Sequence, residues 1–146
     1  MKLRIFFMVA GFAALSCGGG GLPGDVQRFE SRCVKMNANP IAIRVNDPHP
    51  GTKDVYACNL DAGTVKANTR PFPDGTLIVK SSTRIGEDFI WLVATARKQA
   101  GEWQWDEYTR NFSNETFARV PVSESTCTDC HATVATSDWI YTTAAP

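Results

Sequence analysis

The sequence predicts an α+β protein in which an antiparallel β-sheet is flanked by helices. Three observations predict this class. Apolar residues recur at helical spacing over 25–36, strand-like runs separated by turn residues fill 76–109, and Trp103 and Trp105 alternate with polar residues. A chain of 146 residues supports one domain with an apolar core, so helix and sheet are expected to belong to one fold.

The first sixteen residues indicate an export signal. Lys2 and Arg4 form a basic region, residues 5–15 form an apolar stretch too short to span a bilayer, and Ser16 is a small residue at a cleavage point. The segment "AALSC" is similar to the lipobox of bacterial lipoproteins, in which Cys17 would be the lipid-modified first residue. Simple secretion with an incidental cysteine is the alternative.

Both alternatives place the mature protein outside the cytoplasm. Residues 17–25 are predicted to be a Gly-rich tether and residues 26–146 the folded domain. We expect a periplasmic or outer-surface bacterial lipoprotein, attached to the membrane only by its lipid, or otherwise a secreted protein. Fifteen basic residues balance fifteen acidic ones, so charge gives no indication of nucleic-acid binding.

The first element of the folded domain is predicted to be a helix over 25–36. Val26, Phe29, Cys33 and Met36 are spaced by three, four and three residues, which puts them on one face of a helix. That face is expected to pack on the sheet.

Short strands are predicted over 41–45 and 55–60. Between them, "NDPHPGT" at 46–52 has the Asn, Asp, Pro and Gly content of a loop. The stretch from 61 to 70 is expected to be irregular.

The pattern from residue 71 onward predicts the main part of the sheet. "PFPDG" at 71–75 is a turn, and a strand is predicted over 76–81. "FIWLVATA" at 89–96 is apolar on both faces, which is typical of a central strand. A further strand is predicted over 102–109, and 117–122 is either a last strand or an extended segment.

The segment "CTDCH", residues 127–131, carries the chemistry of this chain. Two cysteines in this spacing can attach to the vinyl groups of haem, and His131 would then be the proximal iron ligand. A redox-active CxxC belongs at a helix start after an early strand, and a zinc site needs a second ligand pair downstream. Neither context occurs, so one covalent haem c, held by Cys127, Cys130 and His131, is predicted.

The five cysteines fit an exported haem protein. Cys17 serves the lipid and Cys127 and Cys130 the haem, which leaves Cys33 and Cys58 for a disulfide. That bond would close a loop of about 25 residues and contribute on the order of 3 kcal/mol. Two separately buried thiols are the alternative.

No strong sixth iron ligand is apparent in the sequence. No methionine follows His131, and Met36 is the only methionine after the signal. His49 lies in the Pro- and Gly-rich loop, where a surface or turn histidine is expected. An open distal face is therefore predicted, which is typical of ligand binding rather than of electron transfer alone.

An ordered set of segments resembles the cytochrome P-460 family, which includes the cytochromes c′-beta. The segments are "HPGTKDVYACN" from His49, "PFPDGTLIVK" ending at Lys80, "GEWQWDEYT", "CTDCH" and "SDWIYT". They extend over roughly residues 26 to 146. The helical-bundle cytochromes c′ also carry a C-terminal CxxCH, but they would need a long helical repeat that this chain lacks.

The resemblance assigns expectations to four residues. Lys80 occupies the position of the lysine that is cross-linked to a meso carbon of the porphyrin, and strand parity allows it to point inward with Ile78. The alternative is a lysine that reaches solvent or a haem propionate. Phe72 would be a distal-pocket aromatic or an ordinary core residue. Asp138 and Trp139 would be structural residues beside the haem.

The resemblance implies a protein that acts on small nitrogen compounds. The expected function is hydroxylamine oxidation to nitrous oxide or nitric oxide, and a non-catalytic nitric oxide binder is the alternative. A simple electron carrier is disfavoured. Oxidation needs a distal base, for which the sequence offers Glu107, Glu115 and Glu124 without choosing among them. An unidentified redox partner and a homodimer are also implied.

Overall fold

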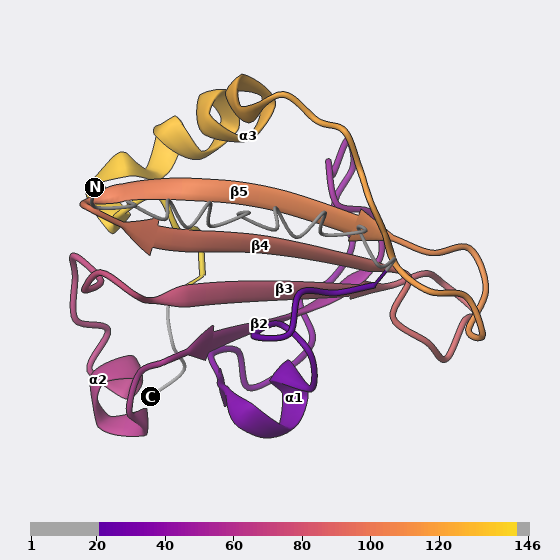
Figure 1. Ribbon diagram of the computed structural model, residues 1–146, viewed down its shortest axis with the longest axis horizontal. Coiled ribbons are helices and arrows are strands. Elements are labelled where there is room, and N and C mark those ends of the chain that lie inside the picture. Colours follow the sequence, from indigo (N-terminus) through magenta and orange to yellow (C-terminus); the bar gives the residue numbers. More distant parts are fainter. Residues whose placement is uncertain (1–20, 143–146) are drawn as a thin grey trace, which may run out of the picture.

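One six-stranded antiparallel sheet organises the protein (Figure 1). The computed structural model describes residues 21–142, so the signal, Cys17 and the first part of the tether lie outside the described residues. Each strand pairs with its neighbour along the chain. The strands are β1 (Val34–Lys35), β2 (Thr52–Cys58), β3 (Leu77–Thr83), β4 (Leu92–Gln99), β5 (Glu102–Thr109) and β6 (Ala118–Arg119).

Short helices flank this sheet, so the predicted α+β class is confirmed. They are α1 (Phe29–Arg32), α2 (Ala62–Lys66), α3 (Glu124–His131) and the 3-10 helix η1 (Ala132–Ser137). Figure 1 shows α1 beside β2 and α3 beside β5, where each makes contacts. Within residues 21–142, no helix has both the length and the apolarity needed to cross a membrane.

Alternating side chains give the sheet two different faces. The N-terminal face carries Tyr56, Val79 and Val93, and the segment with Val26 and Phe29 packs on it. Because side chains alternate along a strand, the residues between these point to the opposite side. We call that side the pocket face; its core cluster includes Val55, Ile78, Ala96, Trp103 and Ile140.

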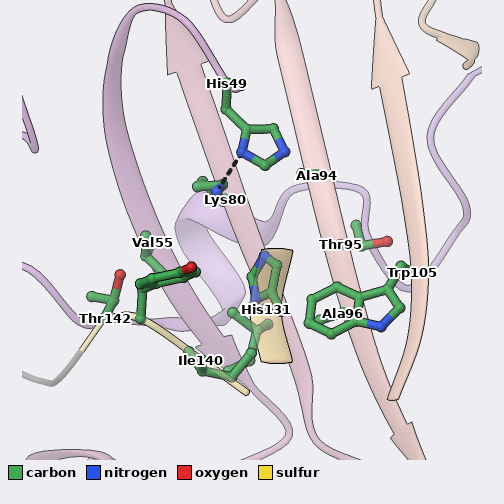
Figure 2. Close-up of a pocket in the computed structure, with 12 residues that line it drawn as sticks. His49, Val55, Lys80, Ala94, Thr95, Ala96, Trp105, His131, Ile140 and Thr142 are labelled. Atoms are coloured by element: carbon green, nitrogen blue, oxygen red, sulfur yellow. Dashed lines mark hydrogen bonds between the residues drawn. The ribbon is translucent and has the colours of Figure 1, made fainter. Parts of the chain in front are cut away.

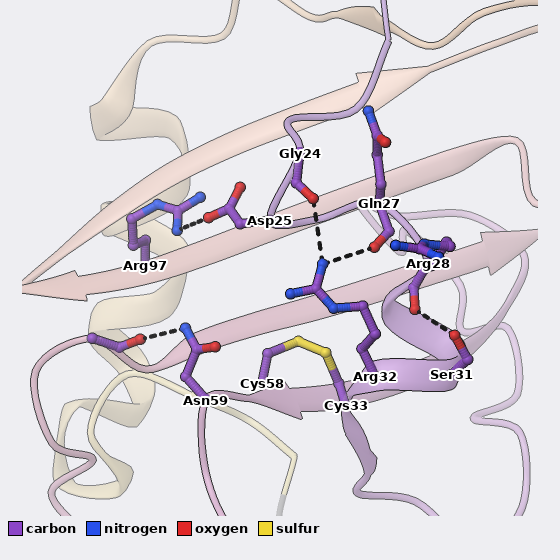
Figure 3. Close-up of a disulfide and its surroundings, with 11 residues drawn as sticks. Gly24, Asp25, Gln27, Arg28, Ser31, Arg32, Cys33, Cys58, Asn59 and Arg97 are labelled. Atoms are coloured by element: carbon purple, nitrogen blue, oxygen red, sulfur yellow. Dashed lines mark hydrogen bonds and ion pairs between the residues drawn. A yellow bond between two sulfur atoms is a disulfide. The ribbon is translucent and has the colours of Figure 1, made fainter.

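A disulfide between Cys33 and Cys58 fastens the N-terminal segment to the sheet (Figure 3). It joins the residue before β1 to the last residue of β2, with the two Cα atoms 4.4 Å apart. Asp25 of the same segment forms an ion pair with Arg97 of β4. The N-terminal segment is therefore held by both covalent and ionic contacts.

The predicted helix over 25–36 is wrong in length. Arg28 has a left-handed backbone (φ 56°), and the α-helix occupies only Phe29–Arg32. Cys33 is extended, with φ −114° and ψ 160°, because the chain there enters the disulfide and β1. Tertiary pairing thus overrides the helical spacing of the apolar residues.

Other boundaries also differ from the predictions. The strand expected over 55–60 is Thr52–Cys58, and the one expected over 76–81 is Leu77–Thr83. The expected strand over 41–45 is reduced to a single bridge between Ile41 and Lys53. The apolar run over 89–96 becomes strand only from Leu92. Helix α2 was not predicted; it begins at Asp61, whose carboxylate accepts a hydrogen bond from the Thr64 amide.

Candidate functional site

Two adjoining cavities open on the pocket face. The larger, of about 500 Å³, lies between the segment 37–49 and the C-terminal segment, and the smaller penetrates between that segment and the sheet (Figure 2). The larger volume falls within the range of small-ligand pockets, roughly 300–1,000 Å³. Both cavities are lined by His49, Lys80, His131, Tyr141 and Thr142.

Helix α3 presents the residues of the CxxCH motif beside these cavities. Cys127 and Cys130 are three residues apart and Cys127 and His131 four, so all three project from one side of the helix. Both thiols are free, and Cys130 lines the larger cavity. Burial raises the pKa of the Cys127 thiol. The motif therefore offers two thiols and an imidazole on one side of a helix, next to an open volume.

The His131 imidazole is fixed in one orientation. Its Nδ1 lies 2.6 Å from the Trp139 carbonyl oxygen and donates a hydrogen bond to it. The ring also lies against Trp105, with centroids 4.2 Å apart, and against Tyr141 at 5.2 Å. Because Nδ1 carries the proton, Nε2 keeps its lone pair. Burial lowers the pKa of His131, which favours the neutral imidazole. This is how protein structures prepare a histidine for binding a metal.

Asp138 anchors the turn that supplies the Trp139 carbonyl. Its two carboxylate oxygens each lie 2.7 Å from Lys98 Nζ on β4. They also accept hydrogen bonds from the Phe72 amide at 2.7 Å and from Trp103 Nε1 at 3.3 Å. Asp138 and Trp139 both adopt positive φ, 53° and 64°, so the turn is tightly bent. Asp138 thus ties the C-terminal segment to the sheet.

Tyr141 connects this turn back to α3. Its hydroxyl donates to the Cys130 carbonyl at 2.9 Å and lies 2.6 Å from Thr133 Oγ1. The segment from α3 to Tyr141 therefore forms one hydrogen-bonded unit around His131.

Phe72 lies in the core and not at the cavities. Its ring packs edge-on against Trp103, with centroids 5.9 Å apart, and Arg70 covers it. It is 2% exposed and lines neither cavity. Phe72 is therefore a core residue of the described structure, and its role beside a bound haem stays a prediction.

Lys80 points into the pocket from β3 (Figure 2). It is paired in register with Val55 of β2 and Ala94 of β4, and like Ile78 it lines the smaller cavity. Its Nζ lies 2.7 Å from His49 Nδ1. Burial is the main cause that lowers the pKa of Lys80 from 10.5 to about 8. The amine is therefore neutral in an appreciable fraction of molecules near neutral pH.

His49 lies in a turn, as expected, but its imidazole is directed into the pocket and not to the surface. Its imidazole lines both cavities and lies between two charged side chains. Nδ1 contacts Lys80, and Nε2 lies 3.3 Å from the Glu107 carboxylate. Figure 2 shows the ring directed toward Lys80. Sequence reasoning missed this because His49 comes from a loop, where no periodicity indicates direction.

Glu107 is the carboxylate, among the three considered, that the structure brings to the site. Glu107 is on β5, where it is paired with Ala94 of β4 and lies on the same face of the sheet as Trp105. Glu115 instead accepts hydrogen bonds from the Asn111 and Phe112 amides in the β5–β6 loop. Glu124 is exposed in the first turn of α3. Strand parity with Trp105 is the signal that could have selected Glu107.

Two further observations bear on what this site can hold. Among residues 21–142, no group of three or more His, Cys, Asp and Glu side chains could hold a metal ion by itself. Trp105, which lines the smaller cavity, has a buried Nε1 without a hydrogen-bond partner in the described part of the chain. A protein-only metal cage is thus not part of the described site.

Comparisons with known proteins do not assign a family. No protein-family model matches the chain, and a search of curated proteins finds no match. The function is therefore argued from the motif and from the geometry around it.

Proposed function

We propose that this protein is an exported c-type haem protein of the cytochrome P-460 kind, which oxidises hydroxylamine at an open iron site. The single observation that carries the proposal is the preparation of His131. Its Nδ1 is held by the Trp139 carbonyl, and its ring lies beside two free thiols and a cavity that Lys80 also lines. Electron transfer alone does not require such a cavity.

The residues present fit haem c. Cys127 and Cys130 would hold the group through thioethers, and His131 Nε2 would be the proximal ligand. The cavity beside them is of ligand size, and its neighbour is lined by the apolar side chains of Val55, Ile78 and Ile140. When bound, the haem supplies an iron that binds a small nitrogen ligand and accepts its electrons.

The protein's own contribution would be acid–base chemistry and exclusion of water. Hydroxylamine must lose protons as it is oxidised, and Glu107 is the carboxylate on the pocket face that can accept one. Ala94 and Trp105 flank that carboxylate along the sheet and keep the surroundings apolar. Lys80, with its lowered pKa, is the amine we propose for the porphyrin cross-link, since bond formation requires the neutral form. The new N–C bond would replace one N–H bond and the meso C–H bond, and the two electrons released would pass to an external oxidant such as a peroxide.

Absorption spectroscopy of the purified protein tests the proposal. We expect covalent haem after denaturation, a strongly red-shifted Soret band in the reduced state, and consumption of hydroxylamine with a suitable electron acceptor. Tryptic peptides should carry haem at Cys127 and Cys130 and a modification at Lys80. Absence of covalent haem refutes the proposal as a whole, whereas an unmodified Lys80 peptide removes only the cross-link.

A nitric oxide-binding protein similar to the cytochromes c′-beta is the second candidate. One observation favours it: the Glu107 carboxylate lies 3.3 Å from His49 Nε2, so this carboxylate already has a partner within the protein. In that case nitric oxide would bind and hydroxylamine would not be consumed. The same preparation decides between the two functions.

The remaining expectations extend this proposal to the cellular setting. We propose a periplasmic or outer-surface location with Cys17 as the lipid anchor, a separate redox partner, and a homodimer. Mass spectrometry of the mature N-terminus tests the anchor, and light scattering tests the dimer. An unmodified Cys17 within an otherwise exported chain would refute the anchor alone.

A further inference from the structure

The turn that carries His49 is fastened to the sheet at several points. Lys53 Nζ, on β2, donates to the Gly51 carbonyl at 2.9 Å and to the His49 carbonyl at 3.3 Å, and it pairs with the Asp47 carboxylate. Asp47 in turn accepts the His49 amide at 3.0 Å. The backbone around His49 is therefore wound about one buried ammonium group.

The far end of the turn is pressed against β3. The Pro50 carbonyl accepts from Ser82 Oγ at 2.6 Å and from Trp91 Nε1 at 3.3 Å. Gly51 has φ 113°, and a side chain there would come within 2.4 Å of Ser82 Oγ and the Thr83 carbonyl. Only glycine permits this approach. These contacts fix the backbone of the loop and therefore the position of the His49 side chain.

The two nitrogens of His49 have different partners on two strands. Nδ1 lies 2.7 Å from Lys80 Nζ on β3, and Nε2 lies 3.3 Å from Glu107 Oε2 on β5. Register places Lys80 and Glu107 on either side of Ala94, two strands apart in the sheet. The His49 imidazole lies between the Lys80 and Glu107 side chains and contacts both. An imidazole with a donor at one nitrogen and an acceptor at the other can pass a proton by exchanging tautomers.

We infer that His49 is a positioning and proton-transfer residue that links Lys80 to Glu107 across the pocket face. The transfer moves one proton and no electrons. In protein whose Lys80 amine is not bonded to haem, Glu107 takes the proton of the ligand and becomes a carboxylic acid. That proton then passes to His49 Nε2 while the proton on Nδ1 passes to the neutral Lys80 amine. The products are the Glu107 carboxylate, the other neutral imidazole tautomer and a Lys80 ammonium, so Glu107 can again accept a proton from a ligand.

This inference deepens the proposed function and rests on it, because the proton arises from the nitrogen ligand. It also explains why Glu107 contacts His49: Glu107 is one end of the proton-transfer path from the ligand to Lys80. The titratable and charged groups around His49 come from three strands, α3, the C-terminal segment and its own loop. They are Lys53, Lys80, Glu107, Cys130, His131, Tyr141, Asp47 and Arg44.

Two substitutions separate positioning from proton transfer. In the haem-loaded full-length protein, H49Q keeps an amide that can contact both neighbours but cannot exchange a proton, whereas H49F removes both capacities. With hydroxylamine as substrate, we expect both variants to lose about 100-fold or more in turnover, with a changed pH profile. E102Q, an exposed carboxylate change on the same strand, should leave the profile unchanged. Wild-type turnover and pH profile in H49Q would overturn proton transfer.

A second measurement does not depend on turnover. In the ¹⁵N NMR spectrum of the ferrous carbon monoxide complex at pH 6, where Lys80 is an ammonium that donates to Nδ1, His49 should carry its proton on Nε2. K80M should shift the Nδ1 resonance and E107Q the Nε2 resonance, while E102Q should shift neither. Resonances insensitive to both pocket substitutions would overturn the link. If the wild-type protein does not consume hydroxylamine, the proposed function fails, and the spectrum still decides whether His49 joins the two residues.

Discussion

The two faces of the sheet use the same strands for opposite purposes. On the N-terminal face, strands β2 to β5 contribute apolar side chains such as Tyr56, Val79 and Val93, and a disulfide closes the layer. On the pocket face, the same strands carry one lysine each on β2, β3 and β4. Burying an ammonium group costs free energy unless the group is paired, so the pocket face stabilises the fold less than the N-terminal face does.

The partners of these three lysines differ. Lys53 and Lys98 each pair with an aspartate, Asp47 and Asp138 respectively. Lys80 contacts an imidazole instead, and burial lowers its pKa to about 8. Lys53 and Lys98 are thus paired ions, whereas Lys80 has no carboxylate bound to its Nζ in the described structure. The comparison indicates that the partner of a buried lysine, and not burial alone, determines whether it stays fully charged.

The largest expected effect is on the pocket face, at the cysteines of α3. Replacing both Cys127 and Cys130 with serine should abolish covalent haem, because no thioether can then form. Haem staining of a denatured gel and intact mass measure this outcome. T128A, in the same helix but with a hydroxyl that contacts only backbone carbonyls of its own helix, should retain the haem. Covalent haem in the double variant would contradict the assignment of the motif.

The next largest effect concerns the buried ion pair beneath the C-terminal turn. D138A leaves Lys98 buried without its partner and should lower the free energy of unfolding by about 3–5 kcal/mol. D106A removes the exposed pair with Arg119 on the other face and should cost about 0–1 kcal/mol. Urea unfolding measures both. Equal losses would mean that the two faces do not differ in the way described.

The disulfide should contribute an intermediate amount on the N-terminal face. The C33A/C58A double variant should lose about 2–4 kcal/mol of unfolding free energy, because the unfolded chain regains conformational freedom. The haem spectrum should remain that of the wild type, since the bond lies across the sheet from the pocket. A shifted Soret band in this variant would show that the faces are coupled.

The smallest effect is a pH dependence of the free energy of unfolding that Lys80 causes. It applies to protein whose Lys80 amine is not bonded to haem. The folded pKa of Lys80, about 8, lies below the ordinary 10.5, so the unfolded chain binds more protons between these values. The free energy of unfolding therefore rises with pH over that interval, and the destabilisation by Lys80 is greatest below it. The stability advantage of K80M over the wild type should be larger at pH 7 than at pH 10. K66M, on α2, is the control, and a constant difference would contradict the shift.

Local alternation was enough to predict β5. The stretch 102–109 matches β5, because tryptophans alternate there with polar residues. The apolar run 89–96 has no such alternation, so its pattern could not fix where β4 begins. Helix α1 is short because the disulfide at Cys33 requires an extended backbone, a constraint set by a residue 25 positions away.

The candidate site was predictable only where a motif or strand parity indicated direction. The position of Lys80 on the pocket face followed from parity with Ile78. The direction of His49 did not, since it depends on how the turn winds around Lys53. Helix α3 was also missed, because it buries none of its residues and so lacks the apolar periodicity that indicates a helix.

The position of the two cysteine pairs has a consequence for how the chain matures. Cys33 and Cys58 meet on one side of the sheet, while Cys127 and Cys130 lie on the α3 side and follow much later in the sequence. In the exported chain that we propose, the first pair could form its disulfide before the second pair emerges from the membrane. In the folded protein the sheet lies between the two pairs, so a wrong disulfide would have to form across it. Both features would keep Cys127 and Cys130 available for the haem attachment that we propose.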